Sequence, residues 1–378
     1  MKILIAPDKF KGNMTSPEVC EIICGAFRKE LPQAELLVLP MADGGEGTAE
    51  ALTKANNGTM YEVKVHGPLG REVTARFGMY DNKRSAVMEM ASASGLALLK
   101  KEERSVLYST TYGTGELIKA ALDAGAVHLT IGIGGSATVD GGTGMARALG
   151  CRFLTEDGKE LTDDIASFRD LAYIDTANMD PRLKDITVRC ACDVTNPLLG
   201  PEGAAAVYGP QKGATPEMVG ILEKSLTRIS EILVKQGMLS GTDGPGDGAA
   251  GGLGAALRAF CHAEMVSGAE LIMKEASLEK HLQGADLLIT GEGCTDGQTQ
   301  SGKLCSQIAL LARRNNVKTL LLSGALKGDP EAIGQLFDYA LSTSTGAHES
   351  LDEAIAAGKK DLAFTAGQIA RLLRKGTI

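Results

Sequence analysis

Tryptophan is absent from this 378-residue sequence, and aromatic residues make up only 4% of it. Proteins that recognise bases or sugars by stacking depend on such side chains, so this composition weakens that interpretation. The sequence also lacks a run of Lys and Arg, and its formal net charge is −8. We therefore expect neither a nucleic acid nor a membrane surface as a partner. If the substrate is an anion, individual Lys or Arg side chains at the binding site must bind it, because the protein as a whole is negatively charged.

Long apolar runs are missing as well. No segment approaches the roughly 18–20 apolar residues of a membrane span, and the apolar run in the opening MKILIAPDKF is too short for a signal peptide. We expect a cytoplasmic protein whose eight cysteines are reduced thiols. Their spacing does not match a zinc site, which favours small core residues over metal ligands.

What the sequence does contain indicates an α/β protein. Hydrophobic residues make up 44% of the chain, and its length allows two domains. Short apolar runs alternate with helical patterns near both ends of the chain, which is typical of a parallel sheet. The runs near the ends lie at 2–7, 35–40, 286–291, 319–324 and 339–344.

The middle of the chain has a different pattern. Three successive strands are predicted at 59–68, 72–81 and 85–94, followed by a helix at about 109–124 and a strand at 128–133. The simplest interpretation is a discontinuous flavodoxin- or Rossmann-like domain of residues 1–58 and 280–378. A mixed α/β domain of residues 59–279 would interrupt it, and a cleft would lie between the two.

Three local predictions accompany this division. Ser16 is the expected N-cap of the first helix, with Pro17 in its first turn. A second helix is expected over about 215–236, capped by Thr215. The segment 240–254, SGTDGPGDGAAGGLG, has the composition of a flexible loop.

Chemistry-bearing residues follow nearly every predicted strand. Ligands of open α/β sheets bind beyond the carboxyl ends of the strands, so these residues are the candidates for a site. Glycines accompany them throughout. They are Asp8, Lys9 and Lys11; Asp43 and Glu46; Ser136, Thr138 and Asp140; Asp193, Thr195 and Asn196; Glu292, Asp296, Gln298 and Lys303; and Ser323 and Lys327.

This combination of residue types favours phosphoryl transfer. Such chemistry uses backbone N–H groups and cations against phosphate charge, carboxylates that hold Mg²⁺, and a carboxylate that accepts a proton. A G-x-S-x-G elbow is lacking, and the five histidines lie outside the glycine turns, which disfavours a covalent hydrolase.

Neither common phosphate-binding fingerprint is complete. GQTQSGKL (297–304) has Leu304 where a Walker A loop needs a hydroxyl. IGIGGSATVDGGTG (131–144) has Ala137 where a dinucleotide-binding loop has its third glycine. Two interpretations of the second segment stay open: it lines phosphates, or its glycines only allow close packing of backbone.

Taken together, the motifs resemble those of the class I glycerate kinases. Such long segments, in the order found in the family, are more specific than a generic glycine loop. The matching segments are APDKFKG (6–12), MADGGEGT (41–48), GIGGSATVDGGTGMARALG (132–150), CDVTNPLLGPEGAAAVYGPQKGA (192–214), GDGAAGGLGAAL (246–257) and ITGEGCTDGQTQSGK (289–303).

The resemblance implies a flavodoxin-like domain with an inserted domain similar to the restriction-endonuclease fold. It also implies transfer of the ATP γ-phosphoryl group to a hydroxyl of D-glycerate, commonly giving 2-phosphoglycerate, with Mg²⁺ as cofactor. Glycerate and ATP are then the small-molecule partners, and a homo-oligomer is possible. One departure stands out, because Cys294 and Thr295 occupy positions where the family usually has Arg and Ile.

We assign roles to the strand-end residues as hypotheses. Either Asp43 or Asp193 is the general base and the other a metal ligand, and that division stays open. The catalytic set is Asp193, Asp43, Lys9 and Asp8; the substrate-binding set is Lys11, Glu46 and Asn196; the nucleotide-binding set is Gly134, Gly135, Ser136, Thr138, Gly141, Gly142 and Lys303; and the metal set is Asp193, Glu292 and Asp296.

Three alternatives remain at this point. The acceptor is a related small hydroxy acid, the 3-hydroxyl of glycerate is phosphorylated, or the protein binds nucleotide without catalysis. The last fits poorly with so many charged groups at strand ends.

Overall fold

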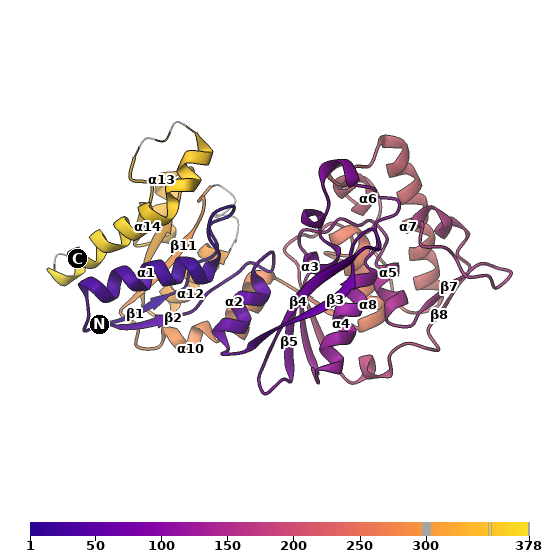
Figure 1. The fold of residues 1–378 in the computed structure, drawn as a ribbon, viewed down its shortest axis with the longest axis horizontal. Coiled ribbons are helices and arrows are strands. Elements are labelled where there is room, and N and C mark those ends of the chain that lie inside the picture. Colours follow the sequence, from indigo (N-terminus) through magenta and orange to yellow (C-terminus); the bar gives the residue numbers. More distant parts are fainter. Residues whose placement is uncertain (297–303, 347, 349, 377–378) are drawn as a thin grey trace. The chain divides into compact units, whose positions relative to one another are not determined.

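A computed structural model describes residues 1–378 except 297–303, 347, 349 and 377–378. The chain forms two compact units (Figure 1). The first consists of Met1–Asp43, Glu50–Asn57 and Ala269–Ile378, and the second of Gly44–Ala49 and Gly58–Gly268. The domains predicted from the sequence, 1–58 with 280–378 and 59–279, stay a prediction. The compact units differ from them at residues 44–49 and 269–279.

The first unit is built on a five-stranded sheet in which every strand pair is parallel. The order across the sheet is β2-β1-β11-β12-β13, so the chain crosses from β2 over β1 to continue on the other side. Figure 1 shows the early strands beside the late ones. The strands are β1 (Lys2–Ile5), β2 (Glu35–Val38), β11 (Leu287–Glu292), β12 (Lys318–Ser323) and β13 (Tyr339–Ser342).

Helices cover both faces of this sheet. In β12, Leu320 and Leu322 join a core with α1 and α14, whereas Leu321 between them joins a core with α12 and α13. This alternation follows from the two-residue period of a strand. The helices are α1 (Ser16–Glu30), α2 (Thr48–Ala55), α9 (Gly268–Glu275), α10 (Leu278–Leu282), α12 (Leu304–Arg314), α13 (Pro330–Leu336) and α14 (Leu351–Arg374).

The start of α1 corrects one sequence prediction. The N-cap is Thr15, not Ser16, because Thr15 and Glu18 form a reciprocal capping box. The Ser16 hydroxyl is used elsewhere: it donates to the Pro7 carbonyl at 2.8 Å and accepts from the Met41 N–H at 2.9 Å. It therefore joins the segments that follow β1 and β2, where candidate site residues begin.

The second unit contains a six-stranded mixed sheet in the order β10-β9-β6-β5-β4-β3. Strands β3, β4 and β5 pair antiparallel, and the remaining pairs are parallel. The strands predicted at 59–68 and 72–81, the helix at about 109–124 and the strand at 128–133 are present in that order. The strand predicted at 85–94 is wrong over its second half, because it ends at Glu89 and residues Ala91–Ser94 form the helix α3. The strands are β3 (Thr59–His66), β4 (Glu72–Tyr80), β5 (Ser85–Glu89), β6 (His128–Gly132), β9 (Thr187–Ala191) and β10 (Glu264–Val266), with the separate pair β7 (Arg152–Leu154) and β8 (Tyr173–Asp175).

One large hydrophobic core joins this sheet to its helices. Thr215 caps α7, as predicted. The α-helices are α3 (Ala91–Ser94), α4 (Tyr112–Asp123), α5 (Thr143–Ala148), α6 (Ala204–Tyr208), α7 (Pro216–Lys235) and α8 (Ala249–Cys261), and the short 3₁₀ helices are Leu96–Leu98, Lys101–Glu103, Ile165–Asp170, Pro181–Lys184 and Pro210–Lys212.

The predicted flexible loop 240–254 is wrong over its second half. Residues from Gly246 onward are buried, and α8 begins at Ala249. Three successive residues at its start, Ala250, Gly251 and Gly252, have left-handed backbone angles. Glycine tolerates that conformation, which explains the composition without flexibility.

A search of the helices among the described residues finds none that is both long enough and apolar enough to cross a membrane.

Candidate functional site

The first unit brings Asp8, Lys9 and Asp43 together. Asp8 and Lys9 follow β1, and Asp43 lies beyond β2, the neighbouring parallel strand. The Lys9 ammonium lies 3.4 Å from Asp43 Oδ1, and the Lys9 N–H donates to Asp8 Oδ1 at 2.7 Å. The carboxyl ends of the two strands therefore present two carboxylates and one cation.

Asp8 has a strongly shifted pKa. Burial, together with the negative charges of Asp43 and Glu292, raises the pKa of Asp8 to about 7, although Lys9 opposes the shift. Burial disfavours the charged form of a carboxyl group, and a neighbouring carboxylate adds to that effect. A carboxyl group with such a pKa accepts a proton readily at neutral pH.

Glu292 ends β11, the strand on the other side of β1. Its Oε1 accepts a hydrogen bond of 2.9 Å from the Thr295 hydroxyl. The Thr295 N–H in turn donates to the Ser323 hydroxyl at 3.1 Å, at the end of β12. Thr295 is buried and Cys294 is half-buried. Thr295 is therefore a polar contact of Glu292, a candidate metal-binding carboxylate.

The other predicted residues of this part of the sequence are placed as follows. Lys11 and Glu46 are exposed, and Asp296 is half-buried. Lys303 lies outside the described residues. The roles predicted for these four residues stay predictions.

The second unit brings three glycine-containing segments into close contact. A Cβ atom on Gly132 would lie 2.5 Å from the Gly44 carbonyl oxygen, and one on Gly44 would lie 3.0 Å from the Ala191 Cβ and 3.1 Å from the Gly268 Cα. Gly132 ends β6 and Ala191 ends β9, two positions before Asp193, whereas Gly44 follows Asp43 and Gly268 begins α9. Glycine is needed where backbones approach this closely.

The segment after β6 divides into an exposed turn and a buried part. Gly134 and Gly135 are exposed, whereas Ser136 to Ala146 are buried. Over the described part of the chain, the N–H groups of Gly134, Gly135 and Ser136 donate no hydrogen bond. Gly135 has φ +75°. Successive unpaired N–H groups around a left-handed residue are typical of an anion-binding nest.

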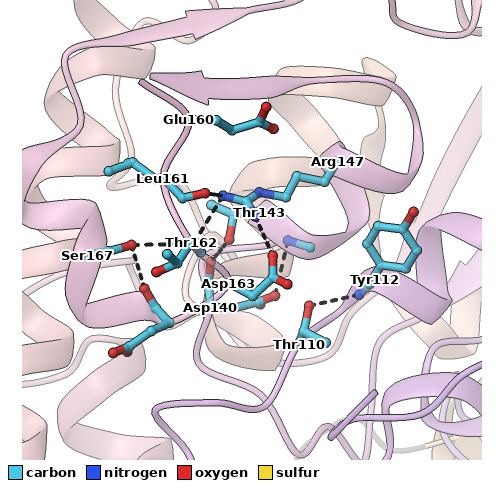
Figure 2. Close-up of polar contacts among 12 residues, drawn as sticks. Thr110, Tyr112, Asp140, Thr143, Arg147, Glu160, Leu161, Thr162, Asp163 and Ser167 are labelled. Carbon is cyan, nitrogen blue, oxygen red and sulfur yellow. Dashed lines mark hydrogen bonds and ion pairs between the residues drawn. The ribbon is translucent and has the colours of Figure 1, made fainter. Parts of the chain in front are cut away.

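The buried part is organised by Asp140. Its carboxylate accepts from the Thr111 N–H at 2.8 Å, the Thr111 hydroxyl at 2.7 Å and the Gly142 N–H at 3.1 Å. Burial raises the pKa of Asp140, and these hydrogen bonds oppose the shift. Figure 2 shows Asp140 beside Thr143 of α5, whose hydroxyl donates to the Asp140 carbonyl at 2.8 Å.

The next turn of α5 is fixed to a neighbouring loop. Arg147 pairs with Asp163 and donates to the Leu161 carbonyl at 2.6 Å and the Thr162 carbonyl at 3.1 Å, as Figure 2 shows. These contacts hold the helix that follows the glycine segment, so Asp140 and Arg147 have structural roles.

Gly141 and Gly142 form a packing contact with α8. The Gly141 N–H donates to the Gly251 carbonyl at 2.9 Å, and the Gly142 N–H donates to Asp140. A Cβ on Gly142 would lie 2.2 Å from the Ala256 Cβ. Their N–H groups are thus engaged within the protein. For Gly141 and Gly142, the contacts agree with the interpretation that glycines allow close packing of backbone.

Ser136 and Thr138 have a neighbour that the sequence analysis did not single out. Lys212 ends the 3₁₀ helix Pro210–Lys212, and its ammonium donates to Ser136 Oγ at 2.6 Å and to the Thr138 carbonyl at 2.7 Å. Burial lowers the pKa of Lys212 to about 7, although the Asp140 charge opposes the shift. The Thr138 hydroxyl is buried and, among the described residues, has no hydrogen-bond partner. In the sequence, only the presence of Lys212 in the family-like segment GPQKGA (209–214) pointed to this lysine as a candidate.

Asp193 and Asn196 follow β9. Asp193 is exposed, and its Oδ1 accepts from the Gly268 N–H at 2.8 Å and the Ser267 hydroxyl at 3.3 Å. Asn196 Oδ1 accepts from the Tyr208 hydroxyl at 2.6 Å, and its Nδ2 donates to the Glu202 carbonyl at 2.8 Å. Asp193 is therefore hydrogen-bonded to the first residue of α9. Asn196 is hydrogen-bonded to residues 202 and 208, shortly after it in the sequence.

The carboxylates and the glycine turn fit hard cations and phosphate. Within the described ranges, no group of three or more Asp, Glu, His or Cys side chains is arranged to hold a metal ion. Mg²⁺ in phosphoryl-transfer sites usually takes only one or two carboxylates and completes its shell with phosphate and water. The like charges that raise the pKa of Asp8 are what a divalent cation would neutralise.

Fold and candidate site together define a two-unit α/β protein with carboxylates, a lysine and unpaired N–H groups beyond its strand ends. The sequence model of the "Glycerate kinase family" matches residues 3–374. The chain is 43% identical to "Glycerate kinase" from Bacillus subtilis (strain 168), covering 99% of this chain and 98% of that protein. It is 42% identical to "Glycerate 2-kinase" from Escherichia coli (strain K12), covering 100% and 99%.

A solved structure agrees with these relatives. The crystal structure of a protein assigned as glycerate kinase 2 from Salmonella typhimurium LT2 matches with a TM-score of 0.91 and 44% identity. The match covers 100% of this chain and 99% of that one. It confirms the mixed α/β fold with parallel sheets. The chain belongs to the glycerate kinase family.

Proposed function

We propose that this protein transfers the γ-phosphoryl group of ATP to the 2-hydroxyl of D-glycerate, giving 2-phosphoglycerate. The observation that carries the proposal is the turn formed by the exposed Gly134 and Gly135 and the buried Ser136, whose three successive N–H groups have no partner in the described chain. Such a turn suits phosphate oxygens. The full-length relatives named glycerate kinase and glycerate 2-kinase support this choice of donor and acceptor.

The first unit supplies the groups suited to the acceptor. Asp8 is our candidate for the general base, because a carboxyl group with a pKa of about 7 is a stronger base than an ordinary one. Lys9 and the exposed Lys11 are cations for the glycerate carboxylate or for phosphate charge. Asp43 keeps Lys9 near Asp8 through the contact at 3.4 Å.

The second unit supplies the groups suited to the nucleotide. Gly134, Gly135 and Ser136 would donate N–H groups to phosphate oxygens, and the unpartnered Thr138 hydroxyl is a further donor. The N–H groups of Gly141 and Gly142 donate to Gly251 and Asp140, and the nucleotide-binding role expected for these two glycines stays a prediction. Asp193 is a carboxylate held by the Gly268 N–H at 2.8 Å. A role for Lys303 at the phosphates stays a prediction.

Glu292 and Asp43, both in the first unit, are our candidates for holding Mg²⁺, and the metal-binding roles of Asp193 and Asp296 stay further predictions. Bound Mg²⁺-ATP would supply the phosphoryl group and neutralise part of its charge. The Thr295 hydroxyl donates to Glu292 Oε1 at 2.9 Å and so helps to fix the orientation of this carboxylate.

The finer description of the fold is also a proposal. Numbered within the first unit, the sheet order β2-β1-β11-β12-β13 becomes 2-1-3-4-5, which is the flavodoxin-like order. The inserted mixed sheet of the second unit is compatible with the restriction-endonuclease-like description. We further propose that the protein acts in the cytoplasm.

A substrate panel tests the proposed acceptor. ADP release from ATP and Mg²⁺ is measured with D-glycerate, L-glycerate, glycolate and lactate. The proposal predicts by far the highest kcat/KM for D-glycerate, the proposed acceptor. All four acids offer a carboxylate to Lys9 or Lys11 and a hydroxyl to Asp8, so the panel measures the effect of the configuration at C2 and of the 3-hydroxyl. An equal or higher kcat/KM for another hydroxy acid would contradict the proposal that D-glycerate is the preferred substrate.

A further inference from the structure

Lys212 is a buried cation that none of the proposed steps uses. It is 2% exposed, at the end of the 3₁₀ helix Pro210–Lys212 and directly before Gly213, which has φ +97°. The flanking backbone therefore turns sharply at this point and directs the lysine into the interior. A Lys buried to this degree is rare unless its ammonium has specific partners.

The partners of Lys212 belong to the glycine segment after β6. Its Nζ donates to Ser136 Oγ at 2.6 Å and to the Thr138 carbonyl at 2.7 Å, so it holds the segment at two points, two residues apart. The ring of Tyr208 lies 5.8 Å from the same nitrogen. An ammonium group held on two sides and facing an aromatic ring has a defined position.

The opposite edge of the turn is held by backbone alone. The Leu96 N–H donates to the Gly135 carbonyl at 2.8 Å, and the Ala137 N–H donates to the Ser94 carbonyl at 2.9 Å. The carbonyls of Gly135 and Thr138 and the hydroxyl of Ser136 are engaged, whereas the N–H groups of Gly134, Gly135 and Ser136 donate to no acceptor in the described part of the chain. Lys212 therefore completes a frame whose open positions are the proposed phosphate donors.

Burying the Lys212 ammonium costs desolvation free energy, and filling space in the core is not a sufficient reason for a lysine at this position. Burial lowers the pKa of Lys212 to about 7, so the folded protein disfavours its charged form. An apolar side chain would fill the same volume without that desolvation. The amine supplies what an apolar group lacks, which is directed donation to the segment that carries the turn.

We propose that Lys212 is a positioning residue for nucleotide binding: it fixes the Gly134–Ser136 turn so that its N–H groups converge on a phosphate. This inference rests on the proposed function, because it takes ATP as the ligand of the turn. Lys212 acts through Ser136 and Thr138. It does not itself belong to the exposed surface of the turn.

The test compares Lys212→Met, which keeps the aliphatic stem, with Lys212→Arg and Ser136→Ala. The matched control is Lys224→Met on the exposed face of α7. ATP affinity is measured by calorimetry, and KM for ATP and for glycerate by steady-state kinetics. We expect Lys212→Met to weaken ATP binding about 10- to 100-fold, because small displacements of positioning groups have effects of this size. KM for glycerate should stay within about twofold.

The other variants keep the inference testable if Lys212→Met folds poorly. Ser136→Ala removes one of the two acceptors and should weaken ATP binding by a smaller factor. Lys212→Arg should restore part of the affinity. Hydrogen exchange of the amides at residues 134–138 should accelerate in Lys212→Met and not in Lys224→Met.

The outcomes separate this inference from the proposed function. Wild-type protein that binds ATP but does not phosphorylate glycerate would contradict the function and leave the binding test of Lys212 intact. If folded variants bind ATP as tightly as the wild type, Lys212 is not a positioning residue, whatever happens to hydrogen exchange. Equal increases in KM for both substrates would also overturn the inference, because they indicate a general structural defect.

Discussion

Asp8 shows how neighbouring charges set the chemistry of a single carboxyl group. The negative charges of Asp43 and Glu292 raise its pKa, and the positive charge of Lys9 lowers it. Desolvation and like charge both disfavour ionisation, so the group changes protonation state near neutral pH. An ordinary surface aspartate would be ionised throughout that range.

The first prediction concerns the pH profile of Asp8. Because its pKa is raised to about 7, the carboxyl group is protonated below that pH and cannot accept a proton from the substrate. We expect kcat/KM to fall as pH decreases through 7. Asp8→Asn should lower kcat about 10²- to 10⁴-fold, as for loss of a general base, and remove this acid limb.

The control for this prediction is Asp170→Asn, at an exposed carboxylate that pairs only weakly at the surface with Arg169. It should keep the wild-type profile. A wild-type acid limb that persists in Asp8→Asn would assign the titration to another group, and near-normal kcat in that variant would exclude Asp8 as the base.

Residue types at strand ends could be predicted from the sequence, but their hydrogen-bond partners could not. The positions after β1 and β2 follow from the apolar runs, so Asp8, Lys9 and Asp43 are found by sequence reasoning alone. The role of Ser16 was mispredicted, because a hydroxyl at a helix start looks like a cap whichever atoms it contacts. Lys212 was missed because its partners are more than 70 positions away.

At the level of elements, the structure separates two uses of glycine within one segment. The turn at Gly134 and Gly135 leaves N–H groups open, whereas Gly141 and Gly142 lie against the start of α8. The start of α8 has its own left-handed turn at Ala250–Gly252. A glycine count cannot tell these uses apart, because only the long-range packing of one segment on the other decides them.

The second prediction tests this packing. In Gly251→Ala, the new Cβ would lie 2.0 Å from the Thr138 carbonyl oxygen, at a position with φ +72°. We expect the free energy of unfolding to fall by about 2–4 kcal/mol, since both the contact and the backbone angle are unfavourable. Urea unfolding followed by circular dichroism measures the change.

Gly220→Ala is the matched control, because a Cβ at this position would have no described atom within 4 Å beyond its chain neighbours and the nearby backbone of α7 itself. It should leave stability unchanged or raise it by up to about 1 kcal/mol, since alanine favours a helix interior. Equal stability of Gly251→Ala and the wild type would show that the two glycine segments do not pack as described.

At the scale of the whole molecule, each unit has its own sheet and its own set of candidate binding groups. The acceptor-side groups follow the parallel strands of the first unit, and the phosphate-binding turn follows β6 of the second. The alternation of strands and helices predicted the parallel sheet because each strand there is an isolated apolar run. The compact units differ from the predicted domains at residues 44–49, which pack with the second unit although the residues on both sides of them belong to the first.

Phosphorus NMR of the reaction products tests the central claim most directly. The protein is incubated with ATP, Mg²⁺ and D-glycerate, and the new phosphate ester is identified through its coupling to the carbon-bound protons. The account predicts 2-phosphoglycerate in amounts equal to the ADP formed, with no ester when glycerate is omitted. Formation of 3-phosphoglycerate alone would contradict the assigned hydroxyl, and absence of any phosphate ester would contradict the proposed kinase activity.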